Sequence, residues 1–246
     1  MMLDARPYDF LGPPLAAARG NVTAAVTEQL RRAIVTLALK PGEVLDKGTI
    51  CDRLGVSRFP VSEALARLQA DGLVDIQPQR GSTVSRVRIA DVEEYMLIRK
   101  ALESEAVRVL IDNRTPSRLS ALADNLAAQR ATTDREAFHQ LDLGFHDLLL
   151  AGMRFDKLRA VIETARANLD RARRLTITPR RLAVSVAEHE QIFAAIVAGD
   201  AAAATMAMRT HIDSAMADLF TLARERPELF ADGDDRLAAP AGFPFG

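Results

Sequence analysis

The chain has 246 residues, of which 48% are hydrophobic and 26% are charged, and its formal net charge is −1. These values exclude a disordered chain and allow one large domain or two small ones. A single cysteine, Cys51, excludes an intrachain disulfide and fits a reducing compartment, and no apolar run reaches the roughly 18 residues that a membrane helix needs. We therefore expect a cytoplasmic protein.

The charges are distributed unevenly along the chain. Residues 1–20 carry equal numbers of acidic and basic side chains and no signal-peptide pattern, so we expect a flexible N-terminal tail. Residues 21–88 hold ten Lys or Arg and seven Asp or Glu, a net charge of +3, which leaves −4 for the residues after 88. This asymmetry fits a DNA-reading module followed by a separate sensing module.

Residues 21–88 have the pattern of three helices followed by a hairpin. Apolar side chains recur at helical spacing in three segments, which we expect to be helices at 22–39, 47–54 and 58–71. Cys51 lies among the apolar positions of the second segment and is expected to be a small core residue. Two extended runs, 73–77 and 83–87, flank a Pro78–Gly81 segment that is typical of a turn. This layout predicts a winged helix-turn-helix domain over residues 21–88.

The candidate DNA contacts lie at the start of the third helix and in the hairpin turn. In a helix-turn-helix, the second helix of the motif enters the major groove with its N-terminal residues. Here that end presents Ser57, Arg58, Phe59 and Ser62. An arginine there can bind guanine or a phosphate, and Arg80-Gly81 at the wing tip suits a minor-groove or phosphate contact. Either arginine taken alone could be an ordinary solvated charge; the complete layout favours DNA binding.

The residues after 89 are rich in Ala, Leu, Arg and Glu and show no further strand pattern. We expect helices at 90–112, 116–131, 134–152, 155–174, 181–198 and 200–225. Six helices with short connections predict an antiparallel all-α bundle over residues 89–226. Residues 227–246 are rich in Pro, Gly and Asp, and we expect a flexible C-terminal tail. The expected fold class is therefore mostly α.

Three of the four histidines have an arrangement that indicates a metal site. Asp142 and His146 are four residues apart in one predicted helix, so both project from the same face. His189 lies ten residues before Gly199 and His211 twelve residues after it, so in two antiparallel helices their imidazoles reach similar levels, about 15 and about 18 Å from the turn. One carboxylate and three imidazoles can bind zinc, our first choice, or nickel or manganese, with positions left for a ligand. The alternative is three histidines that are hydrogen-bonded separately.

Two further residues of the bundle are candidates for a role near this site. His139 shares the stripe of Asp142 and His146 but lies two turns from His146, so we expect it outside the ligand set. Arg99 lies on an inward-facing apolar stripe, where an unpaired charge is costly. Its guanidinium could clamp the carboxylate of an effector or form an internal ion pair with an acidic side chain.

Four segments of the first domain resemble a known family. They are Leu39–Leu45, Leu54–Leu65, Leu68–Val74 and Arg80–Val84. Together they are similar to the N-terminal domain of the GntR family of regulators, and the resemblance implies DNA binding. Many members carry arginine where this chain has Ser62, and some where it has Gly48, so the resemblance leaves the operator sequence open.

The second domain resembles the FCD ligand-binding domain of the FadR-type GntR subgroup over about residues 90–225. The similar segments are Ile98–Glu103, Asp142–His146, Glu188–Asp200 and Met208–His211. The resemblance implies that the metal ligands are Asp142, His146, His189 and His211. It also implies a small carboxylate effector, and it favours an effector contact for Arg99.

We therefore expect a homodimeric DNA-binding regulator, most often a repressor, that binds an operator with two related half-sites. A small carboxylate at the metal site would control it. One rival is a regulator for which the metal itself is the signal, and another is a purely structural metal with the effector bound elsewhere. A metal-dependent enzyme is disfavoured because no general base accompanies the site and an enzyme needs no helix-turn-helix.

Overall fold

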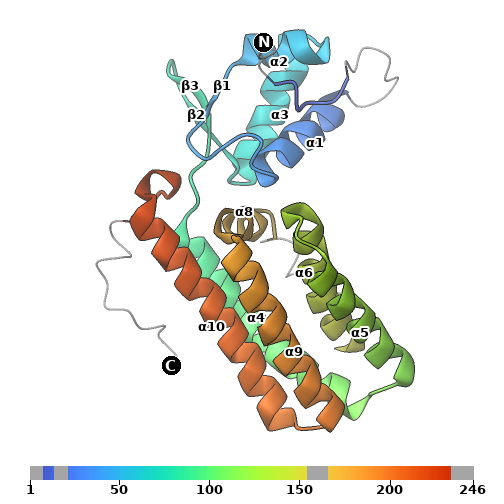
Figure 1. Cartoon of the computed structure of the whole chain (residues 1–246). Helices are drawn as coiled ribbons and strands as arrows, with labels where there is room; N and C mark the ends of the chain where they lie inside the picture. The colour runs from blue at the N-terminus through green and yellow to red at the C-terminus, as the bar shows by residue number, and fades with distance from the viewer. Residues whose placement is uncertain (1–7, 14–21, 154–165, 234–246) are drawn as a thin grey trace, which may run out of the picture. The chain divides into compact units, whose positions relative to one another are not determined.

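The computed structural model describes residues 8–13, 22–153 and 166–233. The chain divides into two compact units: unit 1 contains the residues up to Ile89 and those from Arg226 onward, and unit 2 runs from Ala90 to Glu225. Unit 1 combines short helices with a small β-sheet, and unit 2 is built from long helices (Figure 1). The expected mostly α architecture, a winged helix-turn-helix followed by a helical domain, is confirmed.

Unit 1 contains the three expected helices and a three-stranded sheet. The helices are α1 (Val22–Val35), α2 (Lys47–Leu54) and α3 (Arg58–Ala70), and the strands are β1 (Val44–Leu45), β2 (Val74–Gln77) and β3 (Gly81–Val84). The strand order is β1-β3-β2 with antiparallel pairs. Strand β1 was not expected, and α1 ends before residue 39 because Leu37 adopts a left-handed φ of 62°.

The turn between α2 and α3 sets the direction of α3. The Asp46 carboxylate caps α2 by accepting a hydrogen bond from the Thr49 N–H at 2.6 Å. Gly55 ends α2 with a left-handed φ of 64°, which favours glycine. Ser57 occupies the N-cap position of α3, but its hydroxyl makes no capping hydrogen bond. The apolar stripe of α3 faces the core and consists of Val61, Ala64, Leu65 and Leu68.

The described parts of both terminal segments pack onto unit 1, in contrast to the flexible tails expected at 1–20 and 227–246. Tyr8 and Leu11 are buried, and the Arg53 guanidinium donates to the carbonyl oxygens of both. Near the other end, Phe230 is buried and forms a parallel bridge with Val87. Such pairing of distant segments leaves no periodic pattern in the sequence.

Unit 2 contains the expected helices as far as it is described. They are α4 (Ile89–Asp112), α5 (Pro116–Ala131), α6 (Arg135–Leu150), α8 (Arg166–Thr176), α9 (Pro179–Ala198) and α10 (Ala201–Glu225), with a short 3₁₀ turn η1 (Ala151–Met153). Helix α4 begins at Ile89, where the first segment of unit 1 ends, and a second 3₁₀ turn, η2 (Pro227–Leu229), belongs to the C-terminal segment of unit 1. The first part of the helix expected at 155–174 lies outside the described residues.

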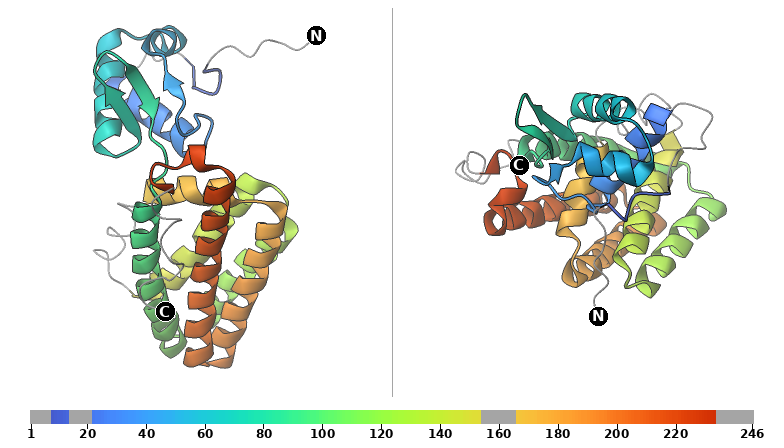
Figure 2. Two further views of the ribbon diagram at one scale, coloured as in Figure 1. Left: turned by 90° about the vertical axis from the view of Figure 1, so that its left-hand side faces the viewer. Right: turned by 90° about the horizontal axis from the view of Figure 1, so that it is seen from above.

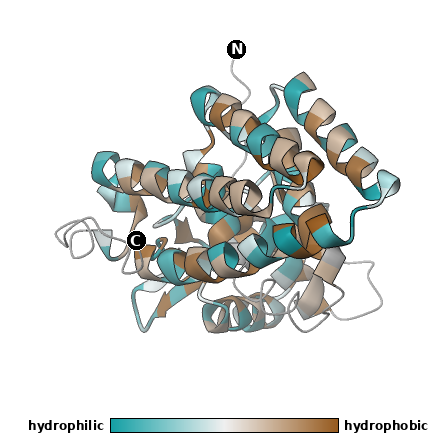
Figure 3. Cartoon of the chain, turned by 90° about the horizontal axis from the view of Figure 1, so that it is seen from below, coloured by the Kyte–Doolittle hydropathy of each residue, from teal (hydrophilic) through white to brown (hydrophobic). Residues whose placement is uncertain are grey.

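Helices α9 and α10 form the hairpin that matters most for the site. Gly199 ends α9 with a left-handed φ of 77°, and the Asp200 carboxylate caps α10 by accepting from the Ala203 N–H at 2.9 Å. The two helices run antiparallel side by side in both views (Figure 2). Apolar and polar segments alternate around the helices of unit 2, as expected for a packed bundle (Figure 3). Among the described residues, none of the helices combines the length and apolar character that crossing a bilayer requires.

Candidate metal centre

Four side chains from three helices meet inside unit 2. Asp142 and His146 come from α6, His189 from α9 and His211 from α10, and all four are buried. One ligand atom from each lies within 4.8 Å of the others. The i and i+4 spacing places the first two on one face of α6, as the sequence predicted.

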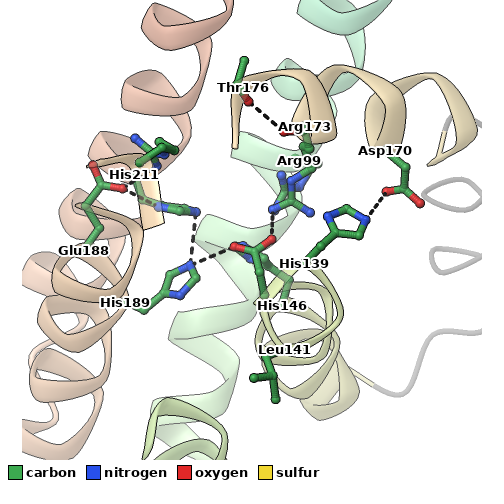
Figure 4. A network of polar contacts seen from close by, with 12 residues as sticks. Arg99, His139, Leu141, His146, Asp170, Arg173, Thr176, Glu188, His189 and His211 are labelled. Atoms are coloured by element: carbon green, nitrogen blue, oxygen red, sulfur yellow. Dashed lines mark hydrogen bonds and ion pairs between the residues drawn. The ribbon is translucent and has the colours of Figure 1, made fainter. Parts of the chain in front are cut away.

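The ligand atoms face a common point. The Nε2 atoms of His189 and His211 are 3.3 Å apart, so the two residues do reach the same level on either side of Gly199. The Asp142 Oδ1 atom lies 3.6 Å from the Nε2 of His189 and 3.9 Å from the Nε2 of His146. Figure 4 shows the imidazoles of α9 and α10 directed toward the face of α6.

Each imidazole is held from behind through its other ring nitrogen. The Nδ1 of His189 lies 2.9 Å from the Gln129 amide oxygen, and the Nδ1 of His211 lies 2.8 Å from the Glu188 carboxylate. The Nδ1 of His146 lies 2.7 Å from the Glu103 carboxylate, a close polar contact whose angles fall outside hydrogen-bond geometry. Outer partners of this kind orient metal-binding histidines and leave Nε2 to the metal.

Asp142 is held in its ionised form. Burial by itself would raise the pKa of this carboxyl, but the neighbouring groups, led by the Arg173 guanidinium, outweigh it and hold the pKa well below its usual range. The Arg173 Nη2 atom is 2.5 Å from the Asp142 Oδ2 atom. The other carboxylate oxygen, Oδ1, is the one that contacts the imidazoles.

Two of the imidazoles, those of His146 and His189, are in contrast held in their neutral form. Burial lowers the pKa of His146 to about 4, against an opposing effect of Glu103. Burial and then His211 hold the pKa of His189 well below its usual range. An ionised carboxylate beside neutral imidazoles is the protonation state that a divalent metal ion needs.

The donor set fits such an ion. The Nε2 atom of His146 is buried without a hydrogen-bond partner, and a buried polar atom of this kind calls for an explanation. A cation bound between His146 and the other three side chains would satisfy it. Three imidazole nitrogens and one carboxylate oxygen suit zinc, and also nickel or manganese.

Arg99 and His139 lie beside the four ligands rather than among them. Arg99 is buried and forms an ion pair with Glu103, whose carboxylate oxygen lies 2.6 Å from the arginine Nε. This is the internal pair that the sequence left open as an alternative to an effector clamp. His139 is also buried, and its Nε2 lies 3.9 Å from the carboxylate of Asp170.

A pocket adjoins the ligand cluster on the side of α8. Its lining includes Asp142 and His211 from the cluster, the two arginines Arg173 and Arg181, and the Ser185 hydroxyl. Arg99 is not among the described residues that line it. The pocket therefore places two positive side chains and two metal-ligand candidates around one small space.

The expected DNA contacts lie on the surface of unit 1. Ser57, Arg58 and Phe59 are exposed at the start of α3, and Ser62 is half-buried one turn later. Arg80 and Gly81 are exposed at the hairpin turn between β2 and β3. Gly81 has a left-handed φ of 95°, and a Cβ there would meet nothing within 4 Å, so the wing tip is open to a close approach.

Sequence reasoning missed the outer residues of the site, namely Glu103, Gln129, Arg173 and Glu188. One of them left a signal that could have been found: Glu103 is four residues after Arg99, so the two share a helix face. Glu188 gives no such signal, because it is adjacent to His189 in sequence but contacts His211 on the neighbouring helix.

Comparison with known proteins assigns both domains. Residues 22–84 match the model of the bacterial regulatory proteins of the gntR family, and residues 94–214 match the FCD domain. A Streptomyces ambofaciens protein named an HTH-type transcriptional regulator in an unstable DNA locus is 38% identical over 208 residues, which cover 82% of this chain and 87% of the relative. The HTH-type transcriptional repressor RspR of Escherichia coli strain K12 is 32% identical over 222 residues, covering 86% and 96%.

Solved structures show the same architecture. The structure of E. coli McbR/YncC aligns with a TM-score of 0.64 at 26% identity and covers 82% of this chain and 98% of that chain. A GntR transcriptional regulator from Rhodococcus sp. RHA1 aligns with a TM-score of 0.67 at 24% identity, covering 82% and 99%. The second likeness, at this identity, supports the fold alone.

Proposed function

Because the chain belongs to the GntR family of bacterial transcription regulators and carries an FCD domain, we propose that a small carboxylate, bound at a divalent metal ion in the helical domain, controls its binding to DNA. Its relatives are DNA-binding regulators rather than enzymes. This sets aside the metal-dependent enzyme considered from the sequence.

The observation that carries the proposal is the convergence of one carboxylate and three imidazoles with their outer partners in place. The four ligand atoms lie within 4.8 Å of one another, and Gln129, Glu188 and Glu103 hold the imidazoles from behind. Separately hydrogen-bonded histidines would not need their Nε2 atoms to face each other. A bound zinc would act here as a Lewis acid that accepts an oxygen of the effector.

The adjoining pocket supports a carboxylate as the effector. Four protein ligands leave coordination positions open on an octahedral or five-coordinate ion. Arg173 lines the pocket and reaches Asp142, so its guanidinium can stabilise the charge of an anion beside the metal. We propose Arg173 as the nearer partner for that anion. For Arg99 to contact the effector, its ion pair with Glu103 would have to break.

The DNA-binding half is proposed to act as a homodimer on an operator with two related half-sites, since a closed dimer and a palindromic site share one symmetry. We propose base and phosphate contacts by Ser57, Arg58, Phe59 and Ser62 and a wing contact by Arg80 and Gly81. One relative is named a transcriptional repressor, and this supports repression as the mode of regulation proposed here. An effector that favours one pose of the dimer would change the affinity for DNA by about 1–3 kcal/mol.

A thermal-shift screen tests the proposal. The purified chain is measured with a panel of small carboxylic acids, each with zinc and each with EDTA. An acid present at about 100 times its dissociation constant adds about 2.7 kcal/mol to the free energy of unfolding, or a shift on the order of 5–10 °C.

We expect one class of acids to raise the melting temperature and EDTA to abolish the effect. If EDTA lowers the melting temperature but no acid raises it, the effector proposal is wrong and the metal is structural or is itself the signal. If neither has an effect, the metal site is wrong as well.

A further inference from the structure

Phe59 is the most exposed large hydrophobic side chain in the described part of the chain, with 72% of its surface accessible. It occupies the second position of α3, directly after Arg58 and two residues after the N-cap Ser57. A phenylalanine that faces water loses the stabilisation that burial would give it. A single exposed apolar side chain is common on protein surfaces. Whether the Phe59 ring has a function therefore depends on the direction in which it projects from α3.

The helix geometry places this ring on the face of α3 that is opposite the core. Successive residues of an α-helix are turned by about 100°, so Phe59 is about 200° from Val61 and about 180° from Leu68. Both of these residues are fully buried in the apolar stripe of α3. The ring therefore projects from the middle of the face that α3 turns toward solvent.

That face is the one a helix-turn-helix presents to DNA. Helix α3 follows α2 after the short turn at Gly55, so it is the second helix of the motif, whose first residues enter the major groove. The next residues on the same face are Glu63, one turn on, and Ala66, two turns on, and both are exposed. Among the first turns of α3, the ring of Phe59 is the large apolar group available to a base edge.

We propose that Phe59 reads thymine by packing against its C5 methyl group in each half-site. This methyl is the apolar feature of the major-groove edge, and apolar side chains are the ones that contact it. Glu63 and Arg58 present charged groups on this face, and Ala66 lies two turns further from the end of the helix that enters the groove. The inference rests on DNA binding by the helix-turn-helix and is independent of the metal and the effector.

The test removes the methyl group and nothing else. The operator is first selected from random DNA with the full-length purified chain, and each thymine in a half-site is then replaced singly by deoxyuridine. Dissociation constants are measured by fluorescence anisotropy at one salt concentration, because affinity for DNA depends strongly on salt. Loss of one buried methyl is expected to weaken binding about fourfold, and its loss in both half-sites about 15-fold.

Two variants identify the side chain responsible. Phe59→Ala is expected to fold normally, because the ring is exposed, and to bind the thymine and uracil operators with equal affinity. Met206→Ala is the matched control, since Met206 is another exposed apolar side chain, 67% accessible, on α10 of unit 2. This control should keep the full preference for thymine.

The proposal is overturned if the native chain binds every uracil operator as tightly as the thymine operator. It is equally overturned if Phe59→Ala keeps the native preference for thymine, or if it weakens both operators while the ratio between them stays the same. The last result would assign the ring to the sugar–phosphate backbone. Failure to select any operator would instead contradict DNA binding itself, so the two failures are distinguishable.

Discussion

Glu188→Gln should weaken metal binding although Glu188 is not a candidate ligand. The Glu188 Oε2 atom accepts from the His211 Nδ1 at 2.8 Å and from the Arg181 Nη2 at 2.7 Å. It thereby fixes the tautomer of His211 and leaves Nε2 unprotonated for a metal. Glutamine keeps the shape of the side chain but loses the charge that makes His211 a stronger donor.

The size of this effect follows from the role of outer partners. Their loss costs about 10–100-fold in metal affinity, and we expect about tenfold because glutamine can still accept one hydrogen bond. Tenfold corresponds to about 1.4 kcal/mol. At a fixed zinc concentration above saturation, the metal-dependent part of the free energy of unfolding should fall by the same amount, which is about 3–6 °C in melting temperature.

The assay is a zinc titration against a competing chelator, with the melting temperature in EDTA measured in parallel. Glu190→Gln is the matched control, because Glu190 lies two residues along α9 and forms a surface pair with Arg130. It should bind zinc with native affinity. Equal zinc affinities for the native chain and both variants would refute the orienting role of Glu188.

Three further perturbations test other parts of the structure. Arg173→Gln should lower the affinity for zinc and for any acid that binds with it, because burial would then raise the pKa of Asp142 without an opposing guanidinium. Native affinities for zinc and for the acid in calorimetry would contradict this prediction. Phe230→Ala should destabilise unit 1 by about 3–5 kcal/mol in urea unfolding, since the ring is buried and the backbone of its segment pairs with Val87. A change below about 1 kcal/mol would show that the terminal segment is dispensable. Gly199→Ala should destabilise unit 2 by about 1–3 kcal/mol, because φ is 77° and the new Cβ would meet the Arg114 guanidinium. An unchanged melting temperature would argue against a left-handed conformation at this position.

The sequence predicts the four candidate ligands because each depends on a local regularity. The helical repeat places Asp142 and His146 on one face of α6. The turn at Gly199 places His189 and His211 at one level, provided only that α9 and α10 are antiparallel neighbours. The apolar stripes then show which face of each helix is buried.

The sequence cannot predict contacts that cross between helices at the level of single atoms. The pairing of His189 with Gln129, and of Asp142 with Arg173, depends on the rotation of each helix and the rotamer of each side chain. Arg99 illustrates the limit, because its stripe predicts burial but does not distinguish Glu103 from an effector as its partner. Strand β1 spans two residues, Val44–Leu45, which is too short for any periodicity to be seen.

The most direct test of the metal-dependent account is the metal content of the chain after incubation with zinc and gel filtration. His211→Ala removes a ligand, whereas His139→Ala removes a buried histidine that lies on the same stripe as Asp142 but outside the four-residue cluster. We expect one zinc ion per chain in the native protein and in His139→Ala, and none in His211→Ala, with all three folded by circular dichroism. A native chain that retains no zinc, or a His211→Ala variant that retains a full equivalent, would contradict the account.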